Sequence, residues 1–251
     1  MMLNSLSLKI FAKLMDNLNF TFNENLIKQK LFPFDSPKRI SLKDEFFTPS
    51  AILFSIVPHE KNIPYELIII HRTDRGLKHR GEMSFPGGKF DPVNDQTLQD
   101  TALREAEEEI GVPRDKIKIL GCLHDMVTLT KYTITPFVAV IDKNQKLVKE
   151  EREVQEILKI PITFFLERKN FKEQIILVED DKFPIFYFNY YNPKNGKKYT
   201  VWGATAYMIA SFFQQVYGYH LSRHGIKRFN LERIRQLKDY IKYKREITSK
   251  F

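Results

Sequence analysis

Three glutamates near the middle of the chain have the type and the spacing of a metal site for phosphate chemistry. Glu105, Glu108 and Glu109 stand at positions i, i+3 and i+4, so a helix would place them on one face, with Glu107 pointing away. Like charges at this spacing destabilise a bare helix by roughly 0.2–0.5 kcal/mol per pair. A hard divalent cation offsets this repulsion, and Mg²⁺ binds through few carboxylates while keeping water and substrate phosphates in its shell.

The residues around these glutamates predict the elements that would position them. Residues 97–110 are rich in good helix formers, and Gly111 supplies a stop signal. A neighbouring apolar stripe can seat this helix on a core; it consists of Leu98, Ala102, Ala106 and Ile110. Arg104 can pair with one carboxylate and fix its rotamer.

A tight turn precedes the predicted helix. Pro86, Gly87 and Gly88 form a turn in which the backbone can closely approach a ligand. An isolated run of glutamates is most often a solvated acidic face. The order of turn, loop, acidic helix and glycine favours a functional site instead.

This arrangement resembles the Nudix box, the signature of the Nudix hydrolases. Its second half is matched in register by Arg104, Glu105, Ala106, Glu108, Glu109, Gly111 and Val112. The first half departs from it: Gln96 falls on the first glutamate position, Phe90 falls on the opening glycine position, and Gly88 lies two residues early. A lengthened loop with Asp91 and Asp95 resembles one branch of the family.

The segment before the box resembles the coenzyme A pyrophosphatase-like branch of this family. An aliphatic strand leads to Arg72-Thr73, followed by Gly81 and by Phe85-Pro86-Gly87-Gly88. Leu77 stands where the branch has Arg, and Thr73 where it has Ser; Arg75 or Arg80 can replace the missing charge. Further similar stretches extend the resemblance over residues 47–217: Thr135-Pro136-Phe137-Val138, Glu153-Val154 leading to Ile160-Pro161, and Trp202-Gly203-Ala204-Thr205-Ala206.

The resemblance implies a metal-dependent pyrophosphohydrolase that cleaves coenzyme A or a derivative. Mg²⁺ or Mn²⁺ would be held by Glu105 and Glu109, with Glu108 as a third ligand or an outer partner, and Arg104 would belong to the same catalytic group. Glu153 is the candidate for orienting the water. Contacts to the anionic nucleotide substrate are expected from Arg72, Arg80, Gly87, Gly88 and Lys89.

Two alternatives remain open at this stage. The substitutions at Thr73 and Leu77 are compatible with another nucleoside diphosphate compound, such as ADP-ribose, NADH or a dinucleoside polyphosphate. Gln96 at the first glutamate position, together with the basic C-terminus, is compatible with a Nudix-fold regulator that binds a nucleotide or a nucleic acid without cutting it.

The net charge of +9 is concentrated at the C-terminus. Residues 227–251 contain nine Lys or Arg against three acids, and apolar residues recur at helical spacing over 229–247, which predicts an amphipathic helix. A solvated basic face is the preferred interpretation, and contact with RNA or an acidic membrane is the alternative. No aromatic RNA-binding signature or zinc spacing accompanies this segment, so a nucleic acid is not the expected partner.

The chain is expected to have an α/β fold with a mixed sheet between helices, which is the α/β/α sandwich that the resemblance implies. Strands are predicted at 51–57, 67–70, 117–123, 134–141, 174–178, 185–190 and 199–202, and a second helix at 204–217. We expect a helical N-terminal extension and connector (1–46), a Nudix domain (47–218) and a basic amphipathic C-terminal extension (219–251). A homodimer would give the two terminal segments partners, but burial within one chain would serve equally well.

The remaining composition predicts a cytoplasmic protein. No apolar run approaches the roughly 18 residues of a membrane span, and the N-terminus lacks a secretory apolar region. The single cysteine, Cys122, excludes an internal disulfide, and its apolar surroundings predict a buried small hydrophobe rather than a nucleophile.

Overall fold

A computed structural model describes residues 20–43, 45, 47–74, 81–128, 130–178, 181–222 and 225–226. The first 19 residues of the predicted N-terminal extension and the predicted basic helix at 229–247 lie outside the described residues. Arg75, Leu77 and Arg80 also lie outside them.

The central element is a mixed eight-stranded sheet. Its main path runs β3 (Met83–Ser84), β2 (Glu66–Arg72), β1 (Thr48–Val57), β7 (Tyr132–Ile141) and β5 (Ile117–Cys122). β4 (Gly87–Lys89) pairs with β1, β6 (Met126–Val127) with β7, and β8 (Val154–Pro161) with β2. β1 and β7 run parallel, whereas the other pairs are antiparallel. The predicted mixed sheet is therefore confirmed.

The segment that holds the two consecutive glycines fills a gap between two diverging strands. β1 and β2 pair with each other only at Ile56–Leu67 and Val57–Glu66. Farther along, β3 pairs with β2 while β4 pairs with β1. Pro86, between β3 and β4, accepts a hydrogen bond at its carbonyl oxygen from Leu53 N at 2.8 Å. Backbone pairing on both sides thus fixes the turn against the sheet.

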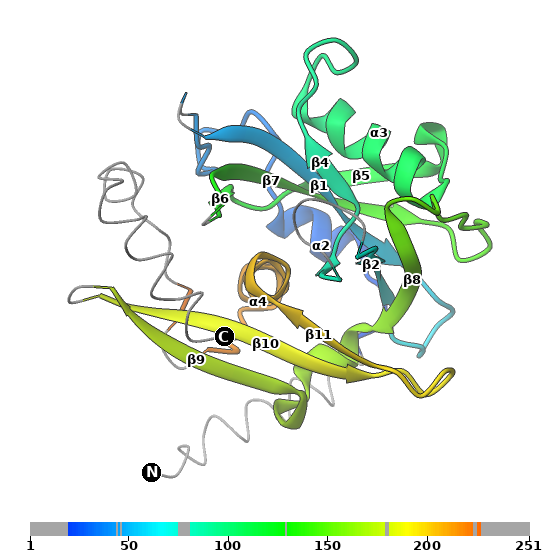
Figure 1. Cartoon of the computed structure of the whole chain (residues 1–251), viewed down its shortest axis with the longest axis vertical. Coiled ribbons are helices and arrows are strands. Elements are labelled where there is room, and N and C mark those ends of the chain that lie inside the picture. Colours follow the sequence, from blue (N-terminus) through cyan, green and yellow to red (C-terminus); the bar gives the residue numbers. More distant parts are fainter. Residues whose placement is uncertain are drawn as a thin grey trace.

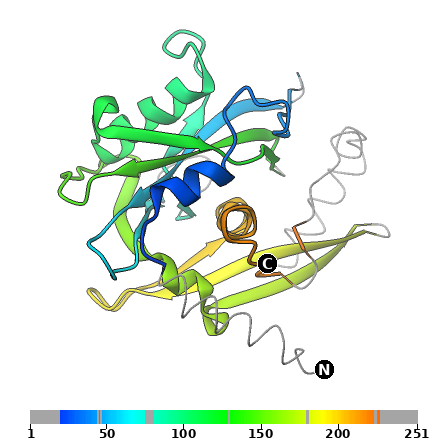
Figure 2. The ribbon, with the colours of Figure 1, turned by 180° about the vertical axis from the view of Figure 1, so that it is seen from behind.

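Helices cover both faces of this sheet (Figure 1). α3 (Leu98–Ile110) packs its alanines, Ala102 and Ala106, into a core with Leu53 and Ile68 on one face. On the opposite face, α4 (Gly203–Tyr217) and the short α2 (Glu24–Lys30) share a core with the other side of β1; Figure 2 shows α2 and α4 on this side. Side chains alternate along β1, so the odd-numbered residues face α3 and the even-numbered residues face α4. This is the predicted α/β/α sandwich.

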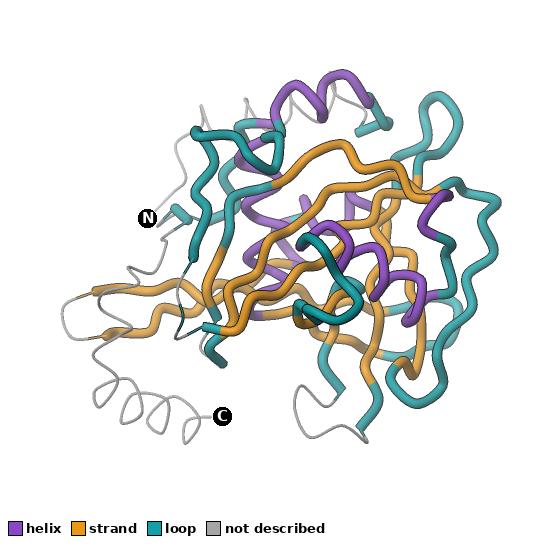
Figure 3. The backbone as a smooth tube through the Cα atoms, turned by 90° about the horizontal axis from the view of Figure 1, so that it is seen from above, coloured by secondary structure: helices purple, strands orange, loops and turns teal. Residues whose placement is uncertain are grey.

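A second sheet covers the outer side of α4. The antiparallel strands β9 (Phe171–Val178), β10 (Asp181–Tyr191) and β11 (Lys198–Trp202) form it. Its inner face buries Phe186, Phe188 and Val201 with α4, and its β9–β10 ribbon extends away from the body (Figure 3). The sequence indicated these strands, but their separation into a second sheet was not predicted.

The connector before β1 is attached to the edge of the main sheet. Phe32 and Cys122 exchange two backbone hydrogen bonds at 3.0 and 2.7 Å, and Arg39 forms a buried ion pair with Asp125. Cys122 is buried, as predicted, and burial raises the pKa of its thiol to about 12. Among the described residues, no helix is long and apolar enough to cross a membrane.

Candidate functional site

The glutamate helix begins and ends with strong local signals. Thr97 is the N-cap: its side chain accepts from the amide of Asp100, whose carboxylate accepts from the amide of Thr97. This reciprocal capping box satisfies backbone donors that the first turn leaves free. Gly111 ends the helix with a left-handed backbone, φ +68°, where glycine avoids the steric cost of a side chain. The helix predicted at 97–110 is confirmed at Leu98–Ile110.

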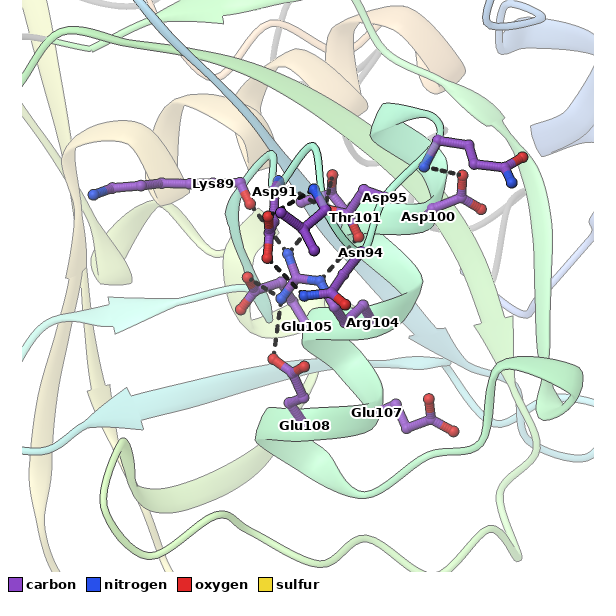
Figure 4. A network of polar contacts seen from close by, with 12 residues as sticks. Lys89, Asp91, Asn94, Asp95, Asp100, Thr101, Arg104, Glu105, Glu107 and Glu108 are labelled. Carbon is purple, nitrogen blue, oxygen red and sulfur yellow. Dashed lines mark hydrogen bonds and ion pairs between the residues drawn. The ribbon is translucent and has the colours of Figure 1, made fainter.

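Two of the three predicted metal ligands are buried where α3 faces the glycine turn. The Glu109 side chain is only 2% exposed, and Glu105 is largely buried as well. Burial raises the pKa of the Glu109 carboxyl to about 7, although Arg72 and the amide of Gly87 act in the opposite direction. Burial also raises the pKa of Glu105. Glu108 is 57% exposed, while Glu107 points away from the network, as expected (Figure 4).

Arg72, at the end of β2, links two of the predicted site residues. Its Nη1 donates to Glu109 Oε1 at 2.6 Å, and its Nη2 to Glu153 Oε2 at 3.2 Å. The second oxygen of Glu109 accepts from the Gly87 amide at 2.9 Å. Thus Arg72, Gly87, Glu109 and Glu153 come together from four different segments of the chain.

Arg104 organises the other side of the site (Figure 4). Its Nη1 donates to Glu105 at 2.8 Å and to Glu108 at 3.0 Å, and its Nη2 donates to the Lys89 carbonyl oxygen at 3.1 Å. Asp95 receives two further bonds, from Nε at 2.9 Å and from Nη2 at 3.0 Å. The expectation that Arg104 pairs with one carboxylate was too narrow, because one guanidinium contacts three.

Gly88 lies so close to Glu105 that a side chain at this position would displace the Glu105 carboxylate. A Cβ at this position would lie 2.2 Å from Glu105 Oε1, well inside van der Waals contact. The close backbone approach predicted for the turn therefore occurs, but toward a carboxylate of the helix.

Of the other two residues predicted to contact the substrate, Lys89 and Arg80, the structure describes only Lys89. The side chain of Lys89 is exposed and projects away from the carboxylate network (Figure 4), and its Nζ lies 6.0 Å from the centre of the Tyr132 ring. Arg80 lies outside the described residues. Lys89 is thus placed at the rim of the site.

Asp95 has a structural role that was not predicted from the sequence. Its buried carboxylate also accepts from Thr101 Oγ1 at 2.8 Å and from the Asp91 amide at 2.9 Å. Hydrogen bonds from Arg104 lower its pKa to about 2. The sequence gives only a weak signal for this pair. Asp95 lies nine residues before Arg104, and that spacing alone does not show that the loop brings the two side chains together.

The donor set fits a hard divalent cation. Carboxylate oxygens are the ligands that Mg²⁺ prefers, and the glycine at position 88 keeps side-chain atoms away from Glu105. Within the described residues, no three His, Cys, Asp or Glu side chains are gathered closely enough to hold a metal ion; Arg72 and Arg104 bind the glutamates instead. Rotation of the glutamate side chains would be needed to bring their oxygens together.

A family model described as the NUDIX domain matches residues 48–182. The chain belongs to the Nudix family. Proteins named "Uncharacterized Nudix hydrolase NudL" from Yersinia pestis (strain Pestoides F) and Yersinia pseudotuberculosis (serotype O:1b) are each 34% identical over 150 residues, which cover 60% of this chain and 72% of each relative. The chain is accordingly a Nudix hydrolase, a pyrophosphohydrolase of nucleoside diphosphate compounds. Nudix hydrolases generally need divalent metal ions.

Solved structures of Nudix proteins are more distant. A MutT/nudix family protein from Enterococcus faecalis is 15% identical with a TM-score of 0.44, covering 72% of this chain and 66% of that chain. The NUDIX domain of Shewanella oneidensis NrtR, complexed with ADP ribose, is 16% identical with a TM-score of 0.38, covering 53% and 82%.

Proposed function

We propose that this Nudix hydrolase cleaves the diphosphate bond of coenzyme A or a derivative, giving 4′-phosphopantetheine and adenosine 3′,5′-bisphosphate. The observation that carries the proposal is the place of residues 83–89, which contain the Phe85-Pro86-Gly87-Gly88 stretch that resembles the coenzyme A branch. They fill the gap between β1 and β2, and Gly87 and Gly88 contact Glu109 and Glu105. The segment that resembles the branch therefore lies against the carboxylates, which supports a shared role in the reaction.

Glu105 and Glu109 would hold Mg²⁺ or Mn²⁺, with Glu108 as a third ligand or an outer partner. When bound there, the cation would supply neutralisation of charge on the phosphoryl oxygens of the diphosphate. Arg104 fixes Glu105 through a hydrogen bond, while Asp95 fixes Arg104 in turn. These contacts hold the side chains of the site in the arrangement described above, from which Glu105 and Glu109 would rotate to share a cation.

Glu153 is the proposed water-orienting group. Its carboxylate is 57% exposed and lies beside Arg72, which also contacts Glu109. An exposed carboxylate next to the buried glutamates can reach a water at the diphosphate and accept its proton at an Oε atom. Lys89 at the rim, together with Arg72 and Arg80, is proposed to contact the anionic substrate, with the backbone of Gly87 and Gly88 near its phosphates.

Leu77, which stands where the resembling branch has Arg, supports a second candidate function, hydrolysis of ADP-ribose, NADH or a dinucleoside polyphosphate. A substrate panel with and without Mg²⁺ or Mn²⁺, read by mass spectrometry, separates the candidates. Metal-dependent release of 4′-phosphopantetheine supports coenzyme A, whereas faster cleavage of another compound would replace it. Binding without cleavage would favour the regulator that Gln96 suggested. The cytoplasmic location and the homodimer remain proposals.

A further inference from the structure

Thr73 has no role in the mechanism proposed above, although it directly follows Arg72. Its hydroxyl donates to the carbonyl oxygen of Arg152 at 2.7 Å, and its amide donates to the carbonyl oxygen of Glu153 at 2.9 Å. Two consecutive residues of the loop between β7 and β8 are therefore held by Thr73. Of the two bonds, only the one to Arg152 depends on the side chain of Thr73.

The same loop is also attached to the glutamate helix. The amide of Glu150 donates to the carbonyl oxygen of Glu109 at 3.2 Å. The Glu150 carboxylate accepts from the amides of Arg152 at 2.8 Å and of Glu153 at 2.9 Å. Backbone contacts thus connect the end of α3, the loop and the residue after β2.

These backbone contacts matter because the side-chain contact of Glu153 is weak. Glu153 is 57% exposed, and its ion pair with Arg72 has a distance of 3.2 Å. An exposed ion pair contributes only about 0–1 kcal/mol, so it does not by itself hold a loop in place. The hydrogen bonds from Thr73 and Glu150 restrict the backbone from which Glu153 reaches the site.

We propose that Thr73 is a positioning residue whose hydroxyl holds the Arg152–Glu153 backbone so that Glu153 stays beside Arg72 and Glu109. The inference rests on the proposed role of Glu153 in hydrolysis. The Thr73 hydroxyl has one hydrogen, and it is donated to Arg152, so the same hydroxyl cannot also donate to a substrate phosphate. Serine would conserve the donor, which explains why threonine can stand where the resembling branch has serine.

The kinetic test compares Thr73→Val, which keeps the shape but loses the donor, with Thr73→Ser, which keeps the donor. Thr73→Val is expected to lower kcat about tenfold with KM within about twofold, because a loosened group misplaces the reacting atoms; Thr73→Ser should restore most of kcat. In a Glu153→Gln background, Thr73→Val should change kcat less than about twofold, since residues that act through one another are not additive. Thr200→Val, which removes a hydroxyl bond on the second sheet, is the matched control and should leave kcat unchanged.

Amide hydrogen exchange tests the same inference without relying on catalysis. Thr73→Val should speed exchange at the amides of Arg152, Glu153 and Thr73 relative to the wild type and Thr200→Val. Unchanged exchange at these amides overturns the loop-holding role, whether or not any substrate is cut. Equal losses of kcat in the wild-type and Glu153→Gln backgrounds, or a rise in KM at constant kcat, also overturn it. Faster exchange in a protein that cleaves no nucleotide would support loop holding and refute the proposed hydrolysis.

Discussion

Asp95→Asn should reveal how strongly the buried Asp95–Arg104 pair stabilises the loop before the glutamate helix. Asp95 has its pKa lowered from 3.8 to about 2. That shift of about 1.8 pKa units, at about 1.36 kcal/mol each, corresponds to about 2.4 kcal/mol of stability at pH 7. The buried amide would also place N–H donors toward Arg104, whose contacts with Glu105 and Glu108 remain. We expect the free energy of unfolding at pH 7 to fall by about 2–4 kcal/mol.

The pH dependence follows from the lowered pKa. Asp95 contributes its full stabilisation above its unfolded pKa of 3.8, and the contribution is lost as pH falls through about 2. At pH 3 about 1.3 kcal/mol of the charge contribution remains, so the difference between wild type and Asp95→Asn should shrink by about 1 kcal/mol between pH 7 and pH 3.

Urea unfolding followed by circular dichroism measures both quantities. Asp115→Asn, which changes an exposed aspartate of a surface ion pair, is the matched control and should cost less than about 0.5 kcal/mol. A difference for Asp95→Asn below about 0.5 kcal/mol at pH 7, or an equal difference at pH 3 and pH 7, would refute the reasoning.

Three further variants test other parts of the site. Gly88→Ala would place a methyl group 2.2 Å from Glu105 Oε1 and should lower kcat at least about tenfold at saturating metal, since small displacements of site groups are costly; a normal kcat would show that Glu105 moves freely. Gly111→Ala puts a side chain at φ +68° and 2.9 Å from Val148, and should reduce the free energy of unfolding in urea by about 1–3 kcal/mol; no loss would contradict the tight packing there. Lys89→Ala should raise KM about fivefold at low salt and less at about 0.5 M NaCl, because salt screens exposed charges; a salt-independent effect would argue against a charge contact.

The local parts of the site could be predicted from the sequence. Good helix formers, the apolar stripe and Gly111 determined the glutamate helix to within one residue, since these signals act over a few residues. The common face of Glu105 and Glu109 followed from helix geometry. The roles of Asp95 and Thr73 could not be predicted, because both depend on contacts between segments that only the folded chain brings together.

The arrangement of the strands was harder to predict. β8 was not among the predicted strands, because Glu156 and Lys159 interrupt its apolar pattern. β9, β10 and β11 were indicated by apolar runs, but these runs carry no information about which sheet they join. The two sheets are distinguished by partners that lie far apart in the sequence.

The most direct test of the account is the metal-dependent hydrolysis of coenzyme A by the wild type and by Glu109→Gln, with circular dichroism to verify folding. Glutamine has nearly the same shape but no negative charge, and electrostatic stabilisation by a bound metal is worth several kcal/mol. We predict release of 4′-phosphopantetheine by the wild type in Mg²⁺ or Mn²⁺, and a loss of at least about 10²-fold in kcat for the folded variant. A folded Glu109→Gln that keeps a near-normal rate would contradict the assignment of the site.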